Sequence, residues 1–245
     1  MVTLYLNEAQ IKALLQLVAC LDNDAFNDIY VQAGVPAKYF YYIAGPVSVG
    51  KTAVISRLQG LEIVDEWLKP RDPLIAKPSN QLTKEEKERV DEYILEQLRL
   101  KNSRFERAQL GLHVMDRAPL DAFAFTPSKE YRAKAQSLYE IACAGASGTP
   151  HEFCAGKLIV LTGHPYDLLT RQKWRGRGGS EEYIQGQQDT LVGIYNDPKS
   201  GDVSFVETSG LNIENVVKEV SRRMHFEPYK EFSFSSRLRD YLVDR

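Results

Sequence analysis

The chain has 245 residues and a mass of 27.8 kDa, a size that suits one α/β domain or one domain with a small extension. Hydrophobic residues make up 43% and charged residues 26%, so the apolar content suffices for a core and excludes predominant disorder. Lys and Arg total 31 against 33 Asp and Glu, and the net charge of -2 lacks the basic excess of a general duplex-DNA binder.

The cysteines and the apolar segments indicate a cytoplasmic protein. The chain has three cysteines, Cys20, Cys143 and Cys154. Their odd number and their spacing do not fit a zinc site, which favours reduced thiols. The first thirty residues include several acidic side chains and no basic leader, which argues against a secretory signal. No apolar stretch approaches the roughly 18 residues of a membrane span, so we expect none.

Residues 1–37 are predicted to form a helical extension in front of an α/β domain at 38–245. Ile11, Leu14, Leu15 and Val18 repeat at helical spacing, and a Gly-Val-Pro turn at 34–36 ends the segment. The extension could pack on the core or form an interface, such as that of a homodimer.

The α/β domain is predicted to be a doubly wound parallel sheet. Five short apolar runs show no clean polar–apolar alternation, which is typical of strands covered on both faces. These runs lie at 39–44, 61–64, 112–115, 158–161 and 203–206. Helical segments alternate with them, near 51–59, 84–109, 129–144, 166–174, 181–195 and 213–224.

A phosphate-binding loop follows the first predicted strand and precedes a helical segment. It fits the pattern G-x-x-x-x-G-K-[ST] in full, with Gly45, Pro46, Val47, Ser48, Val49, Gly50, Lys51 and Thr52. Backbone N–H groups of such a loop cradle a polyphosphate, the lysine reaches the β- and γ-phosphates, and the hydroxyl can ligate Mg²⁺. The motif predicts nucleotide binding and leaves the reaction open.

Polar residues follow the other strands, at the edge of the sheet where ligands bind in open parallel sheets. Asp65-Glu66-Trp67 follows the second strand, and Asp116-Arg117 follows the third. After the fourth, four positive charges fall within residues 171–177, and glycines follow. Beside a phosphate loop, this basic cluster is best interpreted as a mobile arginine lid over a transferring phosphoryl group, although a solvated helix end has the same composition.

These elements, in this order, resemble the thymidylate kinase and deoxynucleoside kinase group of P-loop phosphotransferases. The resemblance runs from about residue 38 to residue 224, and its specific parts are the aspartate–arginine pair after strand three and the arginine lid. The loop and the acidic residue before an aromatic at 66–67 resemble deoxynucleoside kinases more closely. The resemblance implies a five-stranded sheet of order 2-3-1-4-5, with ATP and Mg²⁺ as donor and cofactor.

The resemblance also implies roles for individual residues. Lys51 and Thr52 match the phosphate-loop lysine and the hydroxyl on the Mg²⁺ side, while Glu66, with Asp65 as competitor, matches the carboxylate that accepts a proton from a 5′-hydroxyl. Asp116 and Arg117 match the pair that supports Mg²⁺ and holds the acceptor near the γ-phosphate. The lid arginines are Arg171, Arg175 and Arg177.

Two departures limit this transfer of roles. The family's EP-x-x-x-W pattern is absent because Trp67 follows Glu66 directly, and Ala118-Pro119 replaces the aromatic of many thymidylate kinases. We expect the acceptor's base along the helix at 84–109. Candidate contacts there are Gln97, Arg99, Arg104 and Phe105, the last being better suited to a core than to stacking on a base.

The favoured function is therefore an ATP–Mg²⁺ phosphotransferase acting on a small-molecule nucleoside or nucleoside monophosphate. Two alternatives remain open at the level of the sequence. One is a nucleotide-binding switch or interaction protein on a kinase fold, motivated by the N-terminal extension and by the aromatic tail at 226–245. The other is a kinase for 5′-hydroxyl ends of nucleic acid, which the net charge of -2 disfavours.

Overall fold

The computed structural model describes residues 38–58, 61–77, 81–109, 111–142 and 152–243. The predicted extension at 1–37 lies outside the described residues, as do Cys20 and Cys143. Five parallel strands form one sheet in the order β2-β3-β1-β4-β5, as predicted. They are β1 (Lys38–Ala44), β2 (Glu62–Val64), β3 (Gly111–Asp116), β4 (Lys157–Thr162) and β5 (Val203–Glu207).

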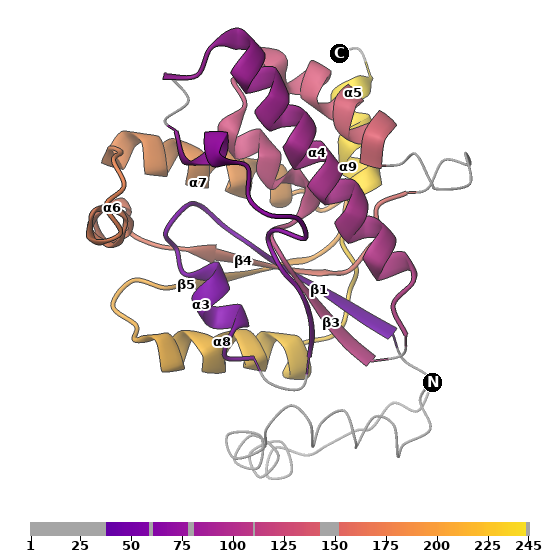
Figure 1. Ribbon diagram of the computed structural model, residues 1–245. Coiled ribbons are helices and arrows are strands. Elements are labelled where there is room, and N and C mark those ends of the chain that lie inside the picture. Colours follow the sequence, from indigo (N-terminus) through magenta and orange to yellow (C-terminus); the bar gives the residue numbers. More distant parts are fainter. Residues whose placement is uncertain (1–37, 59–60, 78–80, 110, 143–151, 244–245) are drawn as a thin grey trace, which may run out of the picture.

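Helices cover both faces of this sheet (Figure 1). One face carries α3 (Lys51–Ile55) and α8 (Ile213–Phe226); the other carries α4 (Lys84–Glu106), α5 (Tyr131–Ala142), α7 (Glu181–Tyr195) and α9 (Phe234–Leu242). Helix α6 (Pro165–Trp174) follows β4, and 3₁₀ turns lie at Pro73–Ala76, Pro119–Phe125 and Ser128–Glu130. Helix α3 ends earlier than the predicted segment 51–59. Within the described residues, no helix combines the length and apolarity needed to cross a membrane.

The core explains why the strands read as continuous apolar runs. Along β1, Tyr42 and Ala44 pack into the cluster under α4, α5, α7 and α9, while Tyr41 and Ile43 pack into the cluster under α3 and α8. Alternate side chains therefore enter opposite cores, and both sets must be apolar.

The C-terminal tail belongs to the same core. Phe232, Phe234 and Leu238 are fully buried, and the Phe232 N–H donates to the Gly156 carbonyl oxygen at 2.9 Å. The aromatic side chains of this tail therefore pack on the chain's own core.

Because all strands run parallel, their carboxyl ends meet at one edge of the sheet. The register pairs Ile43 with Asp116, so the end of β3 lies beside the start of the phosphate loop. This edge positions the candidate site.

Candidate functional site

The loop between β1 and α3 depends on two glycines for its path. Gly45 has φ +143°, and a Cβ there would lie 2.5 Å from the Leu161 carbonyl oxygen. Gly50 has φ +106° immediately before α3. Both conformations are rare for residues with a side chain. The Val47 N–H donates to Gln187 Oε1 at 3.3 Å, which ties the loop to α7.

Lys51 lies buried at the first turn of α3. Its ammonium donates to the carbonyl oxygens of Gly45 at 2.7 Å and Pro46 at 2.9 Å. Burial, together with the nearby Arg117 guanidinium, lowers the pKa of Lys51 to about 8. The side chain therefore lies inside the curve of the loop, where polyphosphate oxygens can replace the two carbonyls as its acceptors.

Thr52 and Asp116 form a pair of oxygen donors beside the loop. The Thr52 hydroxyl donates to Asp116 Oδ2 at 2.8 Å. The other carboxylate oxygen, Asp116 Oδ1, is buried and has no hydrogen-bond partner within the part of the chain that the structure describes. A buried carboxylate oxygen without a partner is costly, so this atom is suited to a ligand of positive charge.

Glu66 and Arg117 are brought together from the ends of β2 and β3. Arg117 Nε donates to Glu66 Oε1 at 2.6 Å. Burial raises the pKa of the Glu66 carboxyl, but the Arg117 guanidinium outweighs this effect and the net pKa lies below its usual range. The competitor Asp65 is exposed. Arg117 has φ +69°, a strained conformation for a residue other than glycine that costs about 1–3 kcal/mol.

The predicted lid arginines divide into two kinds. Arg175 and Arg177, both exposed, line a pocket of about 70 Å³ together with the loop, Glu66 and Arg117. Arg171 instead donates to the carbonyl oxygens of Val49 and Thr208, each at 3.4 Å. The pocket is lined by Val47, Ser48, Gly50, Lys51, Thr52, Ala53, Glu66, Arg117, Arg175 and Arg177.

The candidate base contacts on α4 are not all at the site. Gln97 is buried near it, and its Oε1 accepts from the backbone of the segment after Glu66, at 2.8 Å and 3.2 Å. Arg99 is paired with Glu96. Phe105 is fully buried and stacks on Phe40, so it is a core residue. Arg104 is paired with Glu62, the first residue of β2, at the opposite edge of the sheet.

Two buried charged residues at the site were given no role from the sequence. Lys101 on α4 donates to the Asp116 carbonyl oxygen. Asp121 accepts from the Tyr195 hydroxyl at 2.8 Å, and burial raises its pKa to about 6. Lys101 had a detectable signal, because it interrupts the apolar stripe of Leu98 and Phe105 at helical spacing.

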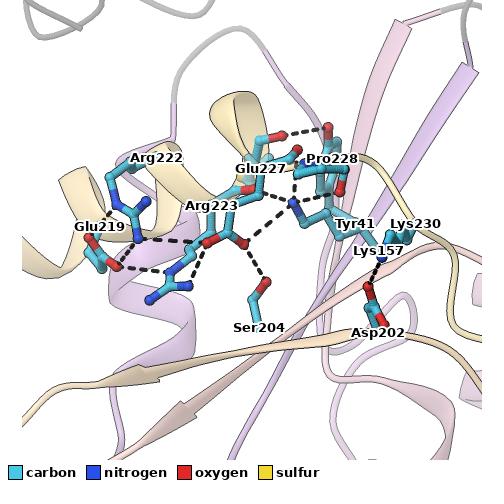
Figure 2. Close-up of polar contacts among 11 residues, drawn as sticks. Tyr41, Lys157, Asp202, Ser204, Glu219, Arg222, Arg223, Glu227, Pro228 and Lys230 are labelled. Atoms are coloured by element: carbon cyan, nitrogen blue, oxygen red, sulfur yellow. Dashed lines mark hydrogen bonds and ion pairs between the residues drawn. The ribbon is translucent and has the colours of Figure 1, made fainter. Parts of the chain in front are cut away.

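A larger cavity, about 390 Å³, lies at the amino ends of β4 and β5, away from the phosphate loop. Its charged side chains are paired with one another, as Figure 2 shows for Lys157, Arg223 and Glu227. The phosphate-loop pocket is smaller, but it is lined by the predicted phosphate loop, Glu66 and Arg117, and its lining residues Lys51, Arg175 and Arg177 form no ion pair with a carboxylate of the described residues.

No family model and no curated protein matches the chain, but solved structures match it. Deoxyadenosine kinase from M. mycoides with bound dATP matches with a TM-score of 0.55 and 18% identity, covering 75% of this chain and 98% of that one. Thymidylate kinase from Candida albicans matches with a TM-score of 0.51 and 12% identity, covering 78% of this chain and 92% of that one. The described chain therefore has the fold of P-loop nucleoside and nucleotide kinases.

Proposed function

We propose that the chain is an ATP- and Mg²⁺-dependent phosphotransferase whose acceptor is the 5′-hydroxyl of a nucleoside. The observation that carries the proposal is the pocket shared by the phosphate loop, the Glu66–Arg117 pair and two lid arginines. Structures of deoxyadenosine kinase and thymidylate kinase, which have this fold, support a nucleoside or nucleotide as acceptor.

Glu66 favours a hydroxyl over a phosphate as the attacking group. A carboxylate in this pocket repels an acceptor 5′-phosphate, whereas it can accept the proton that a hydroxyl loses. In the proposed step, the hydroxyl oxygen bonds to the γ-phosphorus, and the bond from that phosphorus to the β–γ bridging oxygen breaks. ADP leaves with the electron pair, and the proton passes to Glu66. Arg117, Arg175 and Arg177 stabilise the equatorial oxygens.

The residues beside the loop fit a magnesium ion. The Thr52 hydroxyl and the unpartnered Asp116 Oδ1 are oxygen donors, which Mg²⁺ prefers. Among the described residues, no group of three or more His, Cys, Asp or Glu could hold a metal, so phosphate oxygens and water would complete the coordination. Bound Mg²⁺ would neutralise charge on the β- and γ-phosphates.

A transfer assay tests the proposal. The purified chain is mixed with Mg²⁺, γ-labelled ATP and, separately, each nucleoside, each nucleoside monophosphate and a 5′-hydroxyl oligonucleotide. We expect label on at least one nucleoside. In Lys51→Met, which keeps the buried aliphatic stem but removes the ammonium, the rate of transfer should fall by several orders of magnitude. Circular dichroism controls for folding of the variant.

The other results each exclude a part of the proposal. Transfer to monophosphates alone would reject the hydroxyl acceptor, and transfer to the oligonucleotide alone would identify a nucleic-acid kinase. Nucleotide binding without transfer to any acceptor would instead support the switch protein.

A further inference from the structure

Lys101 is a buried lysine whose charge is directed at the candidate site. Its side chain projects from α4 and is 2% exposed, and its ammonium donates to the Asp116 carbonyl oxygen. Burial lowers the pKa of Lys101 to about 8, while the carboxylates of Asp116, Glu66 and Asp121 favour its charged form. A lysine at this depth requires a partner that offsets the loss of hydration.

The Asp116 carbonyl belongs to the peptide group that leads into Arg117. The N–H of the same peptide group donates to the Ile43 carbonyl oxygen at 3.1 Å, across to β1. The peptide plane is therefore fixed at both ends, by Lys101 on one side and by Ile43 on the other. The φ angle of Arg117, +69°, is a rotation away from this plane, so the two contacts fix the preceding side of that strained conformation.

The conformation of Arg117 determines where its guanidinium lies. From this strained position, Arg117 Nε reaches Glu66 Oε1 at 2.6 Å, on the edge of the phosphate-loop pocket. Lys101 also contributes positive charge that offsets the buried carboxylates of the site. Three cations interact there with three carboxylates: Lys51, Lys101 and Arg117 with Glu66, Asp116 and Asp121.

We propose that Lys101 is a positioning residue that holds the Asp116–Arg117 peptide so that Arg117 orients Glu66 for proton acceptance. The expected effect on the rate of transfer rests on the proposed function. It predicts that loss of the Lys101 ammonium slows transfer while leaving the phosphate loop and ATP binding largely intact.

Lys157 provides a matched control. Like Lys101, it is a buried lysine that donates to backbone carbonyl oxygens, here those of Arg223, Glu227 at 3.2 Å and Pro228 at 3.3 Å (Figure 2). It lies at the amino end of β4, the edge opposite the candidate site. A lysine with a purely structural role at position 101 should behave as Lys157 does.

The experiment compares Lys101→Met, Lys157→Met and wild type by kcat and KM. We expect Lys101→Met to lower kcat at least about tenfold with KM for ATP within about threefold, as for a group that acts on the transition state. Lys157→Met should lose stability and keep kcat. Adding Lys101→Met to Glu66→Gln should slow transfer little further, because the two residues act through one contact. Equal kcat in wild type and Lys101→Met, or additive effects in the double variant, would overturn the proposal.

Two further measurements keep the inference independent of folding and of the proposed function. If Lys101→Met does not fold, Lys101→Gln, whose uncharged amide is one bond shorter, replaces it; wild-type kcat together with a crystal structure in which the introduced amide no longer contacts the Asp116 carbonyl oxygen would reject the role. If wild type transfers phosphate to no acceptor, the proposed function fails, and crystal structures decide this inference. Lys101→Met should then lose the left-handed Arg117 and its contact with Glu66, and Lys157→Met should retain both. An unchanged Arg117 in Lys101→Met would overturn the proposal.

Discussion

Glu66 and Asp65 are adjacent in sequence but differ in their surroundings. Glu66 lines the phosphate-loop pocket and is paired with Arg117, whereas Asp65 is exposed. We expect Glu66→Gln to lower kcat about 10²–10⁴-fold with similar ATP affinity, because loss of a general base removes the proton acceptor. Asp65→Asn is the matched control and should remain near wild type. Steady-state kinetics with the accepted nucleoside check both. If Asp65→Asn were nearly inactive and Glu66→Gln active, the general base would be Asp65 and not Glu66.

Asp121 should make stability depend on pH in an unusual direction. Burial raises the pKa of its carboxyl to about 6, from about 4 in an unfolded chain. The folded state therefore binds more protons between pH 4 and 6, and this group's contribution to the free energy of unfolding falls as pH rises through that window. The full loss is about 3 kcal/mol.

Asp121→Asn removes this titration. Its free energy of unfolding, measured with urea at several pH values, should rise relative to wild type from pH 4 to 6 and stay level above pH 6. Tyr195→Phe removes a hydrogen-bond donor that favours the charged form of Asp121, so the pKa of this carboxyl should rise further. The fall in the free energy of unfolding should then continue to higher pH than in wild type. A constant difference between Asp121→Asn and wild type across this range would contradict the assignment.

At the residue scale, the sequence predicts site residues well when they belong to one continuous motif. It predicts poorly those that distant elements bring to the site. The phosphate loop and the Asp116–Arg117 pair are local patterns with a fixed strand context. Lys101 and Tyr195 reach the site only through the packing of α4 and α7 on the sheet. Their proximity depends on helix rotation and depth, which no short pattern encodes.

At the scale of elements, the segment after α6 is suited to act as a lid. Helix α6 ends at Trp174, and Gly176 at φ +68° and Gly179 at φ +152° turn the chain back toward α7. Arg175 and Arg177 are exposed here and line the pocket. Phosphate charge in the pocket should draw both guanidinium groups inward.

We therefore expect Arg175→Ala or Arg177→Ala to lower kcat on the order of 10²-fold with a modest change in KM for ATP. Lysine at either position should rescue only in part, because a point charge does not reproduce the planar fork. Lys173→Ala, which removes a neighbouring exposed charge outside the pocket, is the control. Trypsin should cut this segment quickly in the free protein and slowly with ATP analogue, Mg²⁺ and acceptor. Equal cleavage rates, or wild-type kcat in both alanine variants, would remove the lid from the mechanism.

Helix α9 was not predicted, although its sequence carries a helical pattern. Phe234, Leu238, Tyr241 and Leu242 repeat at helical spacing, but the pattern covers only nine residues. Ser233 caps it by accepting from the Ser236 N–H at 3.2 Å, but isolated helices of this length are marginal in water. Its stability comes from burial of Phe234 and Leu238 against the sheet, which is a tertiary effect.

At the scale of the molecule, the fold follows from the strands. Continuous apolar runs separated by helical segments indicate a parallel sheet covered on both faces, and the structure confirms a sheet of five parallel strands. The order 2-3-1-4-5 could be expected only from the resemblance, since hydrophobicity does not encode which strands are neighbours. The contribution of the tail to the core also lay beyond local pattern, because its partners are distant in sequence, such as Phe153, which lies 82 residues before Ser235.

The tail should therefore behave as part of the folding unit and not as a separable docking segment. Phe234 is fully buried and lies edge-on to Tyr42 with ring centroids 4.6 Å apart. Phe234→Ala should lower the free energy of unfolding by about 3–5 kcal/mol, through lost burial and the cavity left behind. Val243→Ala, at a position 68% exposed just beyond the same helix, should change it by less than about 0.5 kcal/mol. Urea denaturation measures both. Near-equal stability of the two variants would mean that the tail is not needed by the core and would reopen its role as a surface for a partner.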